Sequence, residues 1–197
     1  MTIRILLAVV LGIAVGFFAF PAFLVPHMGL MINIGLWLLL FFVGIDIGRQ
    51  KDILEKIKKM GVKVLLVPMM IGVGSIVGTM LMGLIIKMPL KEAGAIGAGF
   101  GWYTLSAIEL SKHSAELGTL AFVTNVSREV IALVTIPLIA KYIGKVESIA
   151  PAGATAMDTT LPIISRATDG TVAIISFITG VALSTMVPIL VPLIMSL

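Results

Sequence analysis

Five long apolar stretches constrain this chain more than any other feature of its sequence. Each has about 18 or more residues, the length that a helix needs to cross the hydrocarbon layer of a membrane. The longest polar interval, residues 49–63, is too short for a soluble domain. Only 12% of the residues are charged, against about 25% in soluble domains, so water-soluble enzymes and nucleic-acid-binding proteins are excluded. The predicted transmembrane segments are residues 5–24, 30–47, 64–86, 117–142 and 171–195.

Two shorter segments between these stretches have an unusual composition. Residues 93–110 (AGAIGAGFGWYTLSAIEL) and residues 150–166 (APAGATAMDTTLPIISR) are rich in glycine, threonine and serine. As lipid-facing helices they would leave weakly bonded backbone and polar side chains in hydrocarbon. We therefore expect an all-α polytopic membrane protein with five full transmembrane helices and two broken or re-entrant segments that are buried in protein.

The two short segments also resemble each other. When Gly97 is placed on Gly153, GAGFGWYTLSAI (97–108) and GATAMDTTLPII (153–164) share five identities in twelve positions, and a long apolar stretch follows each. Entering from opposite sides, they would form a small inverted repeat whose broken helices meet near the middle of the membrane, a construction typical of transporters. The alternative is that their small residues only allow close helix packing.

Basic residues predict the orientation of the chain. The loop 49–63 holds the densest cluster of lysine and arginine, so we expect it in the cytoplasm, with the N-terminus inside and the C-terminus outside. If both short segments are re-entrant, ten basic residues lie inside and three outside; if both span, the counts are nine and four, so the re-entrant arrangement is favoured. We divide the chain into a three-helix N-terminal part, residues 1–92, and a transport core of two re-entrant-plus-helix units, residues 93–197.

Three charged residues lie at membrane depth. Arg128 and Glu129 are near the middle of the predicted helix 117–142, and Asp158 is in the second short segment. A charge at this depth costs about 2.5 to 3.5 kcal/mol, so we expect these side chains to face protein or water and to bind substrate or protons. The structural alternatives are an ion pair for Glu129, a helix cap or turn for Asp158, and a contact that only holds a re-entrant segment for Arg128.

Polar and aromatic neighbours complete the predicted site. Trp102 and Tyr103 lie beside the glycines of the first short segment, where their rings either face a cationic substrate or belong to an interfacial aromatic belt. No metal and no organic cofactor is expected, because the chain has no cysteine and its two histidines lie in short links. The remaining predicted substrate- or proton-binding residues are Thr104, Ser106, Asn125, Ser127, Thr159 and Thr160.

Three motifs resemble those of a known family. GFGWYTLSAI (99–108), SREVIALVTIPLI (127–139) and GATAMDTTLPII (153–164) are similar, in sequence and order, to the lysine exporter LysO family of bacterial and archaeal inner-membrane proteins. The resemblance implies export of L-lysine, with toxic analogues such as thialysine, and a required intramembrane acidic pair that matches Glu129 and Asp158. Familiar members carry further spans before the matched region. Those helices are expected from a second copy in a homodimer or from a small membrane subunit, unless they are not needed.

Lysine export also sets an energetic requirement. A monovalent cation that leaves an inside-negative cell moves against about 2.3 kcal/mol per 100 mV, so we expect antiport against protons, with sodium as the other possible counter-ion. The alternative functions are a cation channel, because re-entrant segments also build selectivity filters, and a membrane subunit of a larger transport complex. An intramembrane protease is not expected, because neither histidine lies at membrane depth and the acids do not form an aspartate pair.

Overall fold

The computed structural model describes residues 2–18, 21–27 and 61–197, with a few isolated positions between residues 30 and 55. Every regular element within these residues is helical, which confirms the predicted all-α class. The predicted transmembrane segment 30–47 and the predicted cytoplasmic loop 49–63 lie mostly outside the described residues. At the N-terminus, where the transmembrane segment 5–24 is predicted, the structure has α1 (Thr2–Phe18), which ends earlier, and the separate short η1 (Ala22–His27).

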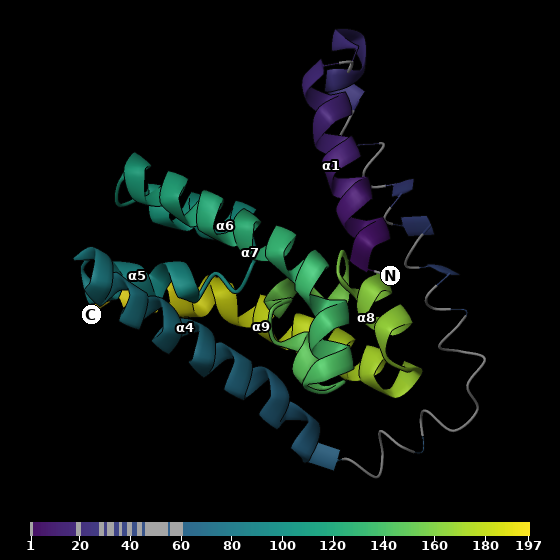
Figure 1. Ribbon diagram of the computed structural model, residues 1–197. Helices are drawn as coiled ribbons and strands as arrows, with labels where there is room; N and C mark the ends of the chain where they lie inside the picture. The colour runs from purple at the N-terminus through teal and green to yellow at the C-terminus, as the bar shows by residue number, and fades with distance from the viewer. Residues whose placement is uncertain are drawn as a thin grey trace.

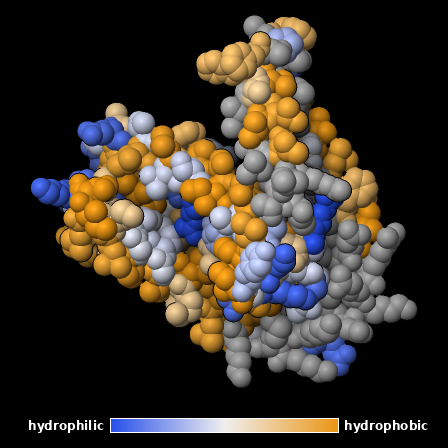
Figure 2. All heavy atoms as spheres, viewed as in Figure 1, coloured by the Kyte–Doolittle hydropathy of each residue, from blue (hydrophilic) through white to orange (hydrophobic). Residues whose placement is uncertain are grey.

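Three of the described helices are long and apolar enough to cross a membrane. They are α4 (Leu66–Ile86), α7 (Ala115–Tyr142) and α9 (Gly170–Ser196), and their bounds agree closely with the predicted ones. All three carry exposed large apolar side chains, and the surface over α4 and α7 is largely apolar in Figure 2. An apolar surface is compatible with the hydrocarbon layer. Within each helix the backbone groups bond to one another, so they need no partner from the lipid.

Polar caps define where two of these helices begin. The side chain of Ser114 accepts a hydrogen bond of 3.0 Å from the backbone N–H of Leu117 at the start of α7. Asp169 accepts two such bonds, of 3.1 and 3.2 Å, at the start of α9. Each cap satisfies N–H groups that have no partner within the helix. The helices therefore begin where the sequence supplies a polar cap before an apolar run.

Both short segments are interrupted helices. The first consists of α5 (Leu90–Gly97) and α6 (Tyr103–Ser111), separated by residues 98–102, which we call the first break. The second consists of η3 (Glu147–Ile149) and α8 (Leu161–Ala167), separated by residues 150–160, which we call the second break and which include the short η4 (Gly153–Met157). Gly101 (φ 98°) and Gly153 (φ 63°) turn the chain in these breaks with positive φ angles, which glycine adopts without steric cost.

The two interrupted helices lie at opposite ends of the bundle. In Figure 1, α5 and α6 occupy the end where α4 stops and α7 starts, and α8 lies at the end where α7 stops and α9 starts. α5 packs against α4, α6 against α7, and η4 against α9. In the alignment that places Gly97 on Gly153, the start of α6 falls close to the start of α8, and the cap Ser114 falls next to the cap Asp169. After each break, therefore, a short helix, a polar cap and a long helix follow in the same order.

The two breaks meet in the middle of the bundle. The backbone N–H of Ala154 donates a hydrogen bond of 2.8 Å to the carbonyl oxygen of Phe100. A Cβ atom on Gly153 would collide with that same oxygen, so the close approach requires glycine. Phe100 is fully buried and belongs to a core with Ala154 and Leu183. The inner ends of the two units are thus packed directly on each other.

Candidate substrate site

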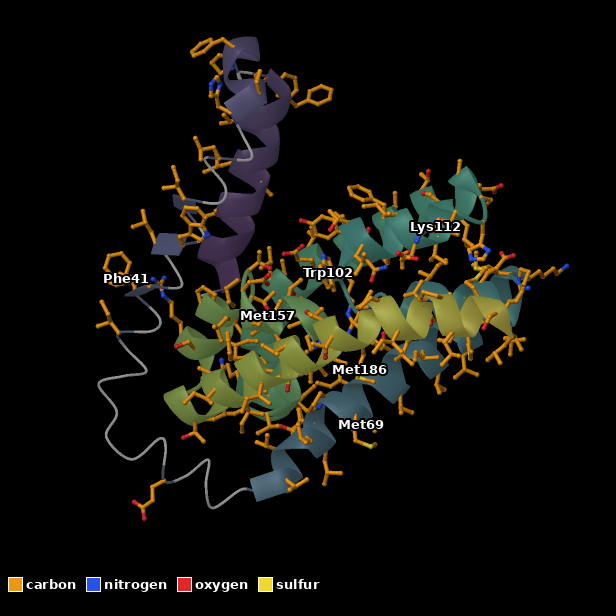
Figure 3. The ribbon with its side chains drawn as sticks, turned by 180° about the vertical axis from the view of Figure 1, so that it is seen from behind. Phe41, Met69, Trp102, Lys112, Met157 and Met186 are labelled. Carbon is orange, nitrogen blue, oxygen red and sulfur yellow. The ribbon has the colours of Figure 1, made fainter. Side chains whose placement is uncertain are left out.

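A cavity of about 220 Å³ lies beside the crossing of the two breaks. Its wall comes from the first break and the start of α6, from α7, from the second break and from α9. Figure 3 shows Trp102 and Met157, two of its lining residues, near the middle of the bundle and Lys112 at one end. The lining residues are Gly101, Trp102, Tyr103, Thr104, Glu129, Ala154, Thr155, Met157, Asp158, Thr159 and Ser184.

Two carboxylates face this cavity and share one threonine. The hydroxyl of Thr159 donates a hydrogen bond to Oε1 of Glu129, and the backbone N–H of Thr159 donates one of 2.6 Å to Oδ1 of Asp158. Glu129 and Asp158 are both half-buried, and no lining residue carries a positive charge. The structure therefore brings together the two acids that the sequence analysis selected, in a site suited to a cation.

Aromatic and hydroxyl groups form the rim of the cavity. Trp102 is 38% exposed, and the ring of Tyr103 packs edge to face against Phe122 with 5.5 Å between ring centroids. Thr104 follows on the same helix and is also a lining residue. Because aromatic faces attract cations, this rim is compatible with the cationic-substrate interpretation of Trp102 and Tyr103.

Asn125 does not line the cavity but holds the first break. Its Oδ1 accepts a hydrogen bond of 2.7 Å from the backbone N–H of Gly101. Its Nδ2 donates to the carbonyls of Ala121 at 3.0 Å and Ile96 at 3.3 Å, and to the hydroxyl of Ser106 at 3.3 Å. Asn125 is 2% exposed, and its side-chain amide bonds to other protein groups. Ser106 is also fully buried and donates to the carbonyl of Trp102 at 2.9 Å.

Arg128, Ser127 and Thr160 also lie away from the cavity. The guanidinium of Arg128 bonds to the second break and to α4, as described below, and within the described residues it has no carboxylate partner. Ser127 is exposed on α7. Thr160 is fully buried and donates to the carbonyl of Thr155 at 2.9 Å. Of the eleven predicted site residues, the structure thus gathers six around the cavity and places five elsewhere.

Met157 and Ser184 also form part of the cavity wall, although neither was predicted from the sequence. Ser184 lies in the middle of α9, and its hydroxyl is 3.9 Å from the sulfur of Met157. Ser176, Gly180 and Ser184 recur at every fourth position and therefore share one face of α9. This face packs against the second break, where Ser176 donates to the carbonyl of Ala156 at 2.7 Å. The spacing of small residues in an otherwise apolar helix was the signal that could have identified it.

The described ranges hold no group of three or more acidic, histidine or cysteine side chains that could bind a metal ion. A bundle of apolar helices, in which two interrupted helices meet beside an acidic cavity, has the architecture of a membrane transporter. The family that the sequence comparisons identify is one of transporters and not of enzymes. Residues 6–195 match the family described as Lysine exporter LysO, and the chain belongs to that family.

Two relatives with known names are similar over much of the chain. The protein named "Lysine exporter LysO" from Escherichia coli (strain K12) is 33% identical over 184 residues, which are 93% of this chain and 60% of that protein. The protein named "Putative lysine exporter" from Haemophilus influenzae (strain ATCC 51907 / DSM 11121 / KW20 / Rd) is 34% identical over 129 residues, 65% of each chain. This chain therefore spans less than two thirds of either relative. No solved structure matches it.

Proposed function

We propose that this chain exports L-lysine across the cell inner membrane, in exchange for protons that bind Glu129 and Asp158. The observation that carries this proposal is the pair of carboxylates in one cavity, joined through Thr159. The names of the relatives support lysine as the substrate. Membership of an exporter family supports the direction of transport.

The chemistry of the cavity suits lysine. Its side-chain ammonium is a compact cation that needs an anionic partner when water is removed, and Glu129 and Asp158 offer two. The rings of Trp102 and Tyr103 add a second attraction for the ammonium. Thialysine keeps the same ammonium at the end of a chain of similar length, so we propose that it is also a substrate. The hydroxyls of Thr104 and Ser184 are available to the polar end of either molecule.

The proton is the proposed counter-ion because the same two carboxylates can bind either a proton or an ammonium. Exchange of one proton for one lysine is electroneutral, so that only the pH gradient drives it. Exchange of two protons, one on each acid, adds the membrane potential, which is worth about 2.3 kcal/mol per charge at 100 mV. Sodium is the competing counter-ion, and lysine flux driven by a pH gradient or by a sodium gradient distinguishes it from the proton.

The arrangement of the interrupted helices supports alternating access. We propose that both are re-entrant, that the N-terminus lies in the cytoplasm and that the C-terminus lies outside. The placement of the two units at opposite ends of the bundle supports this topology (Figure 1). In such transporters, a central site at the meeting point of broken helices opens in turn to each side. The packed breaks at Phe100 and Ala154 are that meeting point here.

Counter-flow in liposomes tests the proposal. Purified protein is reconstituted with unlabelled lysine inside, and the entry of labelled lysine is followed. We expect saturable entry that requires internal lysine. Internal norleucine, which has the carbon chain of lysine without the side-chain ammonium, is the matched control and should not support entry. Absence of counter-flow would contradict the proposal, and ion conductance without counter-flow would favour a channel.

A further inference from the structure

Ser75, in the middle of α4, bonds to both interrupted helices, directly to one and through Arg128 to the other. Its hydroxyl donates a hydrogen bond of 2.9 Å to the carbonyl of Gly97, the last residue of α5. The same oxygen accepts one of 2.7 Å from Nη1 of Arg128. Gly97 lies against α4 so closely that an added Cβ would collide with Thr79. The hydroxyl of Ser75 is therefore fixed at the start of the first break.

Arg128 extends this connection to the second break. Its Nε donates a hydrogen bond of 3.0 Å to the carbonyl of Pro151, and its Nη2 donates one of 3.1 Å to the carbonyl of Ala150. A guanidinium is suited to this role because its donors form a rigid planar fork. The carbonyls at the start of a break lack the partners that a continuing helix would supply, and the guanidinium supplies donors to them.

A continuous chain of hydrogen bonds results. It runs from the carbonyl of Gly97 through Ser75 and Arg128 to the carbonyls of Ala150 and Pro151. It joins the two interrupted helices through two different long helices, α4 and α7. The acids of the site are connected to the same chain of hydrogen bonds. Glu129 follows Arg128 on α7 and bonds to Thr159 at the other end of the second break. Two adjacent residues of α7 thus hold both ends of that break.

We propose that Ser75 and Arg128 are positioning residues, which hold the two breaks together so that Asp158 is presented to Glu129 across the cavity. Arg128 acts through the geometry of its hydrogen bonds and not through contact with substrate, since it does not line the cavity. Ser75 acts as the relay between Arg128 and the first break. Two experiments test this proposal. Measurement of lysine flux rests on the proposed lysine transport, and cysteine labelling does not.

The flux test uses Ser75→Ala and Arg128→Lys, singly and together. Each removes part of the chain of hydrogen bonds, and Arg128→Lys keeps the charge. We expect each single variant to raise the lysine concentration at half-maximal flux about tenfold, the effect of one lost hydrogen bond to a charged group. The double variant should be no worse than the more impaired single variant, because both act on one link. A general loss of folded protein would lower only the maximal flux.

Two variants serve as controls in this test. Ser75→Thr keeps the hydroxyl, and its extra methyl has room in the groove of about 610 Å³ beside Ser75, so it should restore near-normal flux. Thr119→Ala on α7 removes an exposed hydroxyl that bonds only within its own helix and should have no effect. Additive effects in the double variant, or normal behaviour of Arg128→Lys, would overturn the positioning role.

The labelling test needs no substrate. Because the chain has no native cysteine, Ser148→Cys places a unique thiol next to the second break, at a side chain that is fully buried. In this background, Ser75→Ala and Arg128→Lys should raise the rate of reaction with a water-soluble maleimide at least tenfold, and Thr119→Ala should not change it. Unchanged rates in both variants would overturn the inference. Raised rates in a protein without lysine flux would support the link and contradict the proposed function.

Discussion

Replacement of Glu129 by glutamine tests the role of the acidic pair. Glutamine has the same shape and can still accept the hydrogen bond from Thr159, so only the charge is lost. The attraction between a carboxylate and an ammonium about 4 Å apart is roughly 1 kcal/mol in water and about 4 kcal/mol near a protein surface. Glu129 is half-buried, so we take a value between these limits, about 2 to 3 kcal/mol. At about 1.4 kcal/mol per tenfold, this predicts a 30- to 140-fold rise in the half-saturating lysine concentration.

The assay is lysine counter-flow with purified, reconstituted variants, normalised to folded protein. Asp158→Asn should behave like Glu129→Gln, because both carboxylates face the same cavity. The matched control is Glu109→Gln on α6, where the acid pairs with Lys112 at 2.7 Å at the end of the bundle, and it should keep normal flux. If both cavity variants stay within threefold of the parent protein while saturating normally, the assignment of the acids is wrong.

Three further predictions concern Thr159 and the helix ends. Thr159→Val removes the hydroxyl that reaches Glu129 and should raise the half-saturating lysine concentration about tenfold, whereas Thr159→Ser should not. Gly153→Ala should cost at least about 1 to 2 kcal/mol from its positive φ alone, and its Cβ would also displace the carbonyl of Phe100; the thermal unfolding midpoint in detergent should fall, and an unchanged midpoint would contradict the packing of the breaks. Asp169→Ala removes the cap of α9 and should cost about 1 kcal/mol at neutral pH. Burial raises the pKa of Asp169, but hydrogen bonds from Lys145 and from the first N–H groups of α9 outweigh it and hold the pKa below its ordinary value. This stabilisation is therefore present above about pH 4 and is lost as the pH falls further, so the unfolding midpoints of the variant and the parent protein should converge in acid and differ at pH 7.

Three of the long helices and the positions of the two acids could be predicted because their signals are local. Apolar length alone located α4, α7 and α9. The cost of charge in hydrocarbon selected Glu129 and Asp158, which line the cavity, and also Arg128, which does not. The two breaks could be located approximately, because glycine, threonine and serine replace strong helix formers in both short segments. Each of these inferences requires only a stretch of sequence no longer than one transmembrane helix.

The contacts that each polar residue of α7 makes could not be predicted in the same way. Asn125, Arg128 and Glu129 all signal polarity at membrane depth, but adjacent helix positions point about 100° apart, and sequence does not show what lies in each direction. In the structure, Asn125 bonds to the first break, Arg128 bonds to the second and Glu129 lines the cavity. These directions depend on contacts between residues that are far apart in the chain.

Lysine flux in liposomes under an imposed pH gradient, with the membrane potential clamped at zero, tests whether this chain couples lysine export to protons. We predict that an inward proton gradient drives lysine outward against its own gradient in the parent protein, and that Glu129→Gln and Asp158→Asn abolish this coupling. The converse experiment, with a potential and no pH gradient, distinguishes exchange of one proton from exchange of two. Flux that ignores both the pH gradient and the potential would contradict antiport, and flux that responds only to sodium would replace the proton as the counter-ion.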